Sequence, residues 1–210
     1  MSFLFNMKIN LTPYHTSLNI NSKCSTKPSF KSSLPVETIK HCNIGMMKNG
    51  YIGKVQVMKA NGELTYLNVF KNANSMSEIY SVKDDLEQAI GFIELKIKKY
   101  QDYDKFTFPQ DPSHVFVETL RNFSKPSTPY YTEGLEEYKN IGTRLMQIAQ
   151  RRSDEAMCNG NIELISKGES FNFYKKLGFQ SSRTFWGENP NKMYIPPEAK
   201  EALSRAYGGL

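Results

Sequence analysis

Alternation of apolar and polar positions predicts strands throughout the first half of the chain. Residues 51–70 contain two alternating runs that are joined by Asn61-Gly62, and this dipeptide between alternating runs is the strongest short-range signal of a β-hairpin. Residues 89–100 and 114–123 alternate in the same way and predict two further buried strands. The segment 75–88 is expected to be a short helix or a loop, because its serines and aspartates suit helix caps.

The period changes to that of a helix in the second half. Apolar residues recur at helical spacing between 140 and 158, which predicts an amphipathic helix. Its polar face is expected to present four side chains to water: Arg144, Arg151, Arg152 and Asp154. The other elements expected are a strand at 161–166, a short helix over 169–177 that Gly178 ends, a last strand around 193–195 and a closing helix from Pro197.

Strands dominate the first half and alternate with helices only in the second, which predicts an α+β or α/β fold with a mixed sheet. Residues 1–45 are rich in Ser, Asn, Thr and Lys and lack a hydrophobic period. We therefore expect a basic, mostly disordered N-terminal extension over 1–45. Residues 46–210 are expected to form one folded domain.

Composition argues against membrane, secreted and zinc-binding proteins. No apolar run approaches the roughly 20 residues that cross a bilayer. The apolar stretch at the start of the sequence is shorter than a signal peptide requires. The three cysteines and three histidines are scattered, without the spacing of a zinc site or a disulfide framework. We therefore expect a cytoplasmic protein with no membrane partner and no metal site.

The net charge of +6 raises the question of nucleic-acid binding. Residues 1–45 hold five lysines and one glutamate, whereas residues 46–210 hold 22 basic and 20 acidic side chains. The folded part is thus close to neutral, which argues against nucleic acid as the partner. Binding through the basic extension is kept as an alternative, and it predicts an interaction that weakens with salt.

Residues 139–143, Lys-Asn-Ile-Gly-Thr, stand where the long helix begins. A helix start offers unpaired N–H groups and the positive end of the helix dipole, and both favour phosphate. Gly142 would let a ligand approach the backbone, Thr143 would add a hydroxyl donor, and Asn140 tolerates a left-handed backbone. The alternative is an ordinary helix start, since Gly and Thr are common there.

Three segments, NIGTRLMQIAQ, NIELIS and SFNFYKKLGF, follow one another in an order that resembles the core of the Gcn5-related N-acetyltransferase (GNAT) superfamily. Gly142 matches the second glycine of the loop that opens the family's main helix. Four residues match its F-Y-x-x-x-G-F element: Phe173, Tyr174, Gly178 and Phe179. The resemblance spans roughly residues 87–196, and it implies a mixed, largely antiparallel sheet flanked by helices.

The resemblance implies acetyl-CoA as co-substrate and an amine as acceptor, on a small molecule or on a protein. The pyrophosphate would bind at Lys139, Asn140, Ile141, Gly142 and Thr143. The pantetheine arm would lie along the strand that ends near Leu120 and Arg121. Tyr174 would protonate the leaving thiolate, since a phenol with an ordinary pKa near 10 is protonated at neutral pH. Its alternative role is packing on Phe173 and Phe179.

A base would ease the deprotonation of the acceptor amine, which is a cation at neutral pH. Glu118 is the candidate, because it lies on the strand that would line the cleft. Alternation along this strand places Glu118 on the same face as Leu120 and puts Val117 on the other face. His114 lies on the same face and is a weaker candidate. A solvated carboxylate that takes no part in catalysis is the alternative for Glu118.

The loop departs from the family pattern at two positions. Glu137 stands where relatives carry Arg or Gln, and Asn140 stands in place of the first loop glycine. These departures motivate a second hypothesis, a catalytically inactive GNAT-like module that binds CoA or a protein partner. The oligomeric state is left open, a homodimer included.

Overall fold

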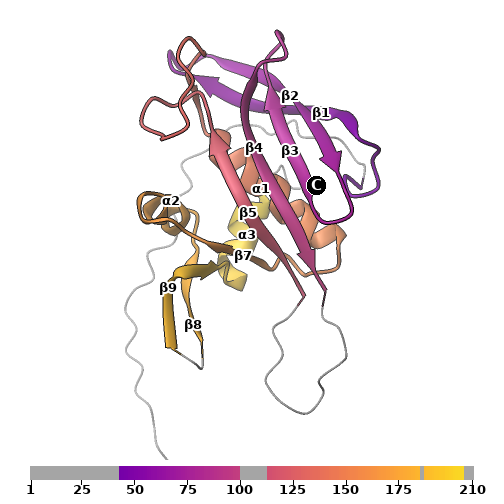
Figure 1. The fold of residues 1–210 in the computed structure, drawn as a ribbon, viewed down its shortest axis with the longest axis vertical. Coiled ribbons are helices and arrows are strands. Elements are labelled where there is room, and N and C mark those ends of the chain that lie inside the picture. Colours follow the sequence, from indigo (N-terminus) through magenta and orange to yellow (C-terminus); the bar gives the residue numbers. More distant parts are fainter. Residues whose placement is uncertain (1–42, 100–112, 185–186, 206–210) are drawn as a thin grey trace, which may run out of the picture.

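The computed structural model describes residues 43–99, 113–184 and 187–205 (Figure 1). Within these residues one nine-stranded sheet has the order β6-β1-β2-β3-β4-β5-β7-β9-β8. The strands are β1 (Gly50–Lys59), β2 (Leu64–Ala73), β3 (Glu78–Lys83), β4 (Ala89–Lys98), β5 (His114–Asn122), β6 (Tyr138–Lys139), β7 (Ile162–Ile165), β8 (Gln180–Thr184) and β9 (Gly187–Tyr194). The helices are α1 (Ile141–Glu155), η2 (Gly168–Ser170), α2 (Phe171–Lys176) and α3 (Pro197–Arg205).

The sheet is mixed and largely antiparallel. Each neighbouring pair of strands is antiparallel except β5 and β7, which run parallel. The parallel pair requires a crossover connection, and α1 provides it between β5 and β7. The predicted α+β class with a mixed sheet and flanking helices is confirmed.

Most predicted elements are present. The Asn61-Gly62 hairpin joins β1 to β2, and Gly62 has the positive φ of 93° that such a turn needs. The strand ending near 123, the long helix, the short helix before Gly178 and the closing helix are all confirmed. Gly178 has a φ of 92°, as a glycine that ends a helix usually does.

Two predictions for the strands need correction. Residues 75–88 were expected to be helix or loop, but Glu78–Lys83 form β3 between β2 and β4. The apolar side chains of Tyr80 and Val82 are fully buried on one face of the sheet. Their burial, with pairing to a strand on each side, stabilises β3 although the residues around them favour turns. The hairpin partner of β9, β8, was not predicted, because QSSRT has little apolar alternation.

One face of the sheet is buried under α1. Figure 1 shows α1 behind β4 and β5, and it packs against both strands. Ile93, Leu95 and Val115 are fully buried on this face. On the opposite face, Phe92, Lys96 and Phe116 are only half-buried. The sheet thus has one face in the core and one open to solvent in its central strands.

The polar face of α1 is less exposed than its sequence suggested. Arg144 was expected to face water, but it is only 2% exposed. Its Nε donates a hydrogen bond of 2.8 Å to the carbonyl of Gln56 in β1, and its Nη1 donates one of 3.0 Å to Oε1 of Gln147. Arg152 is also partly buried, because its guanidinium pairs with Glu78 of β3 at 2.7 Å. The curvature of the sheet brings β1 and β3 close to this helix, which a helical period alone does not reveal.

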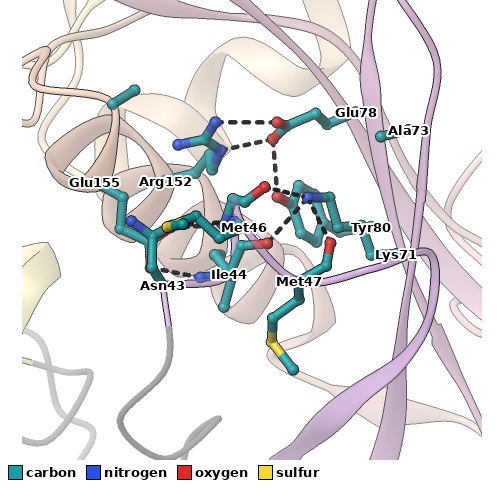
Figure 2. A network of polar contacts seen from close by, with 12 residues as sticks. Asn43, Ile44, Met46, Met47, Lys71, Ala73, Glu78, Tyr80, Arg152 and Glu155 are labelled. Atoms are coloured by element: carbon teal, nitrogen blue, oxygen red, sulfur yellow. Dashed lines mark hydrogen bonds and ion pairs between the residues drawn. The ribbon is translucent and has the colours of Figure 1, made fainter.

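Residues 43–47 are fixed to the core by a polar network that Figure 2 shows. The buried ammonium of Lys71 donates hydrogen bonds to the carbonyls of Ile44, Gly45 and Met47, at 3.0, 2.7 and 3.2 Å. The Glu155 carboxylate accepts bonds of 2.9 Å from the N–H groups of Ile44 and Gly45. The predicted boundary between residues 45 and 46 lies within this segment, and residues 1–42 lie outside the described residues.

Replacement of Lys71 by methionine is expected to destabilise the fold by about 3 kcal/mol, because it leaves buried carbonyls without a donor. The free energy of unfolding, measured by urea denaturation, checks this. Lys48→Met removes the same charge from an exposed side chain of the adjoining segment and is expected to change stability by less than about 0.5 kcal/mol. Equal effects of the two substitutions would contradict the structural role of Lys71.

Candidate functional site

The start of α1 leaves backbone donors unused. Asn140, the residue before the helix, has a left-handed backbone with a φ of 69° and makes no capping bond with its side chain. The first backbone bond of the helix is donated by Arg144 to the carbonyl of Asn140, at 3.0 Å. Within the described residues, the N–H groups of Ile141, Gly142 and Thr143 therefore have no acceptor.

Two of the three residues are partly exposed, Gly142 and Thr143, whereas Ile141 is 1% exposed. The first turn of α1 contains no acidic residue. Three free donors at the positive end of a helix dipole form a site for an anion such as a phosphate group. The prediction that residues 139–143 bind an anion thus has a geometric basis, because neither a side-chain cap nor another backbone group accepts hydrogen bonds from these donors.

Gly142 also has a packing role that the sequence did not suggest. A Cβ atom at this position would lie 2.9 Å from Cζ of Phe173 in α2, closer than real Cβ contacts. The missing side chain therefore lets the F-Y element of α2 pack directly on the start of α1. Gly142 thus brings two parts of the candidate site together, and its own N–H has no acceptor within the described residues.

Lys139 is directed away from the helix start. Its ammonium donates a hydrogen bond of 2.9 Å to the carbonyl of Ala60, in the turn between β1 and β2. Lys139 and Tyr138 form β6, which pairs with Met58 and Lys59 at the edge of the sheet. This pairing fixes the backbone just before the free N–H groups, so Lys139 positions the loop in this structure.

Strands β5 and β7 separate beside the start of α1. Their pairing runs only from Val115 opposite Ile162 to Val117 opposite Leu164. Beyond Val117, β5 continues to Asn122 and pairs with β4 alone. Its other edge there presents backbone groups without a strand partner, over about 13 Å at 3.3 Å per residue. An extended ligand with amide groups can pair with such an edge as a strand would.

Leu120 and Arg121 lie on this unpaired part of β5 but point to opposite faces. Leu120 is opposite the fully buried Ile93 and faces the core, whereas Arg121 is opposite Phe92 on the open face. Gly91 lies between Ile141 of the α1 start and the backbone of Arg121, because a Cβ there would be 3.0 Å from Cγ2 of Ile141 and 2.6 Å from the Arg121 carbonyl. The Arg121 backbone is therefore near the loop, but its side chain is on the other side of the sheet.

A β-bulge in β5 explains why these residues do not follow the expected alternation. Glu94 is opposite Thr119 and Leu95 is opposite Val117, so Glu118 has no partner in β4. An extra residue of this kind shifts every later side chain to the other face and re-aims the strand locally. The sequence expectation that Glu118 and Leu120 share a face is therefore wrong.

Glu118, the predicted base, is exposed and forms an ion pair. Its Oε1 lies 2.9 Å from the ammonium of Lys96 on β4. Glu94 lies on the same open face, is half-buried, and has no hydrogen bond or ion pair within the described residues. Glu94 was not predicted from the sequence, because its position opposite Thr119, next to the bulge, depends on the register of β4 against β5.

Tyr174 packs in an aromatic cluster at the end of α2. Its ring contacts Phe173 and Phe179 edge-on, with centroids 5.0 and 5.8 Å apart. The residue is 7% exposed, and burial raises the pKa of its hydroxyl to about 12. The hydroxyl has no hydrogen-bond partner within the described residues. Tyr174 therefore packs in the aromatic cluster and also has a hydroxyl proton that no other described residue uses.

His114 lies far from the bulge, at the first position of β5. It is buried, and its Nε2 is 3.5 Å from Oε2 of Glu163, which is also 3.0 Å from the ammonium of Lys192. Glu118 is four residues after His114, which corresponds to about 13 Å along the strand. The structure therefore does not bring the second base candidate into the site.

The described residues contain no helix that combines the length and the apolar character that crossing a membrane requires. They also contain no group of three or more His, Cys, Asp or Glu side chains placed to hold a metal ion. Cys158 is buried, and Cys24 and Cys42 lie outside the described residues.

No protein-family model and no curated protein sequence matches the chain. Solved structures similar to it include Naa20 of Chaetomium thermophilum in complex with a bisubstrate analogue, with 17% identity and a TM-score of 0.43 over 59% of this chain and 68% of that one. A bacterial toxin has 14% identity and a TM-score of 0.42 over 64% and 75% of the two chains. AtaTR bound with AcCoA has 17% identity and a TM-score of 0.41 over 62% and 76%.

Similarities this distant carry no inference about ligand or activity, so the fold is assigned from the chain's own strand order. The elements implied by the resemblance are present in the implied order: β5, the loop at the start of α1, the parallel strand β7, the short helix α2 and the last strand β9. The order of elements and the mixed sheet that the sequence resemblance implies are thus confirmed.

Proposed function

We propose that this protein transfers an acetyl group from acetyl-CoA to an amine. The observation that carries the proposal is the set of free N–H groups at Ile141, Gly142 and Thr143, next to the unpaired edge of β5. The first feature suits the pyrophosphate of CoA, and the second suits its extended, amide-containing pantetheine arm. An arm that runs down β5 from Asn122 would bring the thioester to the bulge at Glu118, where β7 closes the gap.

The reaction proposed is direct attack by the neutral amine. Its lone pair forms a C–N bond with the thioester carbon, the C–S bond breaks, and the nitrogen passes its extra proton to water, which balances the proton that the thiolate receives. Tyr174 is the proposed donor that protonates the departing thiolate, since its raised pKa keeps the phenol protonated at neutral pH. The thiol of CoA has a parent pKa near 8.5, so such a donor assists its departure.

Calorimetric titration with acetyl-CoA and with S-acetylpantetheine tests the cofactor part of the proposal. Acetyl-CoA is expected to bind at least tenfold more tightly, because only it carries the phosphates for the α1 start. Release of free thiol is then followed with a panel of primary amines. Equal affinity for the two thioesters would remove the phosphate role of α1, and binding without acetylation of any amine would refute the enzyme.

A GNAT-like module that binds CoA or a protein without catalysis is the second candidate. Two features favour it: Lys139 contacts Ala60 instead of the helix start, and the loop carries Glu137 where the family has a cation or an amide. It predicts acetyl-CoA binding with no amine-dependent thiol release. The titration and the amine panel together distinguish the two candidates.

A further inference from the structure

The Arg121 guanidinium lies near two aromatic rings on the open face of the sheet. Its guanidinium carbon lies 5.6 Å from the ring centre of Phe92 and 4.3 Å from that of Tyr130. Phe92 is opposite Arg121 in the pairing of β4 with β5. Tyr130 comes from the loop after β5, which is held there by a hydrogen bond of 2.9 Å from the Thr132 N–H to the Phe123 carbonyl. Contacts with two rings from different parts of the chain restrict where the guanidinium can lie.

This guanidinium lacks the partner that such a group normally has. Its Nε is buried and makes no hydrogen bond, and no carboxylate pairs with Arg121 within the described residues. A buried donor without an acceptor is costly and calls for an explanation, such as an absent ligand. A planar, pre-oriented guanidinium is the side chain that recognises a carboxylate by two parallel hydrogen bonds.

Glu94 lies close to Arg121 on the same face without pairing with it. Glu94 is opposite Thr119, and Phe92 is opposite Arg121, so Glu94 and Arg121 are diagonal neighbours at about 7–8 Å. Each of these two charges lacks an ion-pair partner within the described residues. Glu118, by contrast, is already paired with Lys96 at 2.9 Å. Two unpaired, opposite charges on neighbouring strands match a ligand that carries both charges.

We propose that the acceptor is an amino acid in the broad sense, that is, a small molecule or the end of a polypeptide that carries both an ammonium group and a carboxylate. Glu94 would bind the ammonium beside the bulge, and Arg121 would bind the carboxylate. This proposal rests on the proposed function, which puts the thioester at the same bulge. It names the substrate class, and it assigns contact with the acceptor nitrogen to Glu94 in place of Glu118, because Glu94 has no cation paired with it within the described residues.

The phosphates of CoA are the other anions in the proposed complex. The Arg121 side chain is on the open face, whereas the start of α1 packs over Gly91 on the core face. The sheet therefore separates this guanidinium from the phosphate-binding N–H groups. Arg121 is accordingly a specificity residue for the acceptor, and removing it should leave acetyl-CoA affinity unchanged.

The test uses a series of ω-amino acids, from glycine to 6-aminohexanoate, each compared with its carboxamide. In the wild type, kcat/KM for the best acid is expected to exceed that of its amide by at least tenfold. Arg121→Met should lower kcat/KM tenfold or more for the acid and less than threefold for the amide. Arg121→Lys should restore only part of the preference, because a point charge lacks the bidentate geometry. Lys83→Met, which removes a cation from β3, is the charge control and should not change the preference.

A binding readout separates the failure of this proposal from that of the proposed function. Saturation-transfer NMR with the same acids and amides, in the presence of CoA, reports contact with the protein without turnover. The acids are expected to give a signal that Arg121→Met removes and Glu94→Gln weakens. Acids and amides that behave alike in the wild type would overturn the carboxylate site, whatever the turnover. Acid-specific binding without acetylation would keep the site and refute the enzyme.

Discussion

Gly142→Glu is expected to weaken acetyl-CoA binding by at least 100-fold. The substitution places a carboxylate on the first turn of α1, beside the free N–H groups of Ile141 and Thr143. Two like charges about 5 Å apart repel by roughly 3 kcal/mol at an effective dielectric constant near 20, which corresponds to a factor of about 100 or more. The new side chain would also meet the Phe173 ring, since even its Cβ would be 2.9 Å from Cζ. Calorimetry with acetyl-CoA measures the loss.

Two further variants separate charge from packing. Gly142→Ala adds only the Cβ that meets Phe173, so it tests displacement of α2 without a new charge. Gly142→Ala combined with Phe173→Leu relieves that contact and should recover most of the affinity lost in the single variant. Gly142→Glu protein that still binds acetyl-CoA with wild-type affinity would show that the cofactor does not use the start of α1.

The sequence predicted the elements whose local patterns are strong. Asn61-Gly62 predicted the first hairpin, because few other dipeptides accept the backbone of its turn. The helical period of α1 and the glycine at 178 predicted the two helices that meet at Phe173. The site segments are local motifs of this kind, so their positions in the fold could be predicted from the chain alone.

Other features depend on contacts between distant residues, and no local pattern contains them. The bulge at Glu118 arises from the register of β5 against β4, and it decides that Arg121 faces Phe92 and that Glu94 lies beside Thr119. Arg144 is buried because the curved sheet brings the Gln56 carbonyl to α1. The helical period of α1 placed Arg144 on the solvent-facing side of the helix, and only its contact with β1 shows that the side chain is buried. The acceptor site proposed above consists almost entirely of such register-dependent residues.

Tyr174→Phe is expected to lower kcat about 100-fold and to change the acetyl-CoA affinity by less than twofold. The substitution removes one oxygen from a side chain that is 7% exposed, so the ring contacts with Phe173 and Phe179 remain. A positioned general acid contributes about 10²–10⁴ to the rate, and that contribution is lost with the hydroxyl. Thiol release gives kcat and calorimetry gives the affinity. Unchanged turnover would leave Tyr174 a packing residue, as its aromatic contacts alone suggest.

The pH dependence provides a second check on the same residue. Burial raises the pKa of Tyr174 to about 12, so the phenol keeps its proton throughout the range from pH 6 to 10. A role as acid is therefore fully available across this range and is lost only as the pH approaches 12. Wild type and Tyr174→Phe should accordingly give pH profiles of the same shape between pH 6 and 10, displaced by a constant factor. An alkaline decline in wild type below pH 10 that disappears in the variant would mean that the hydroxyl ionises there, in conflict with its burial.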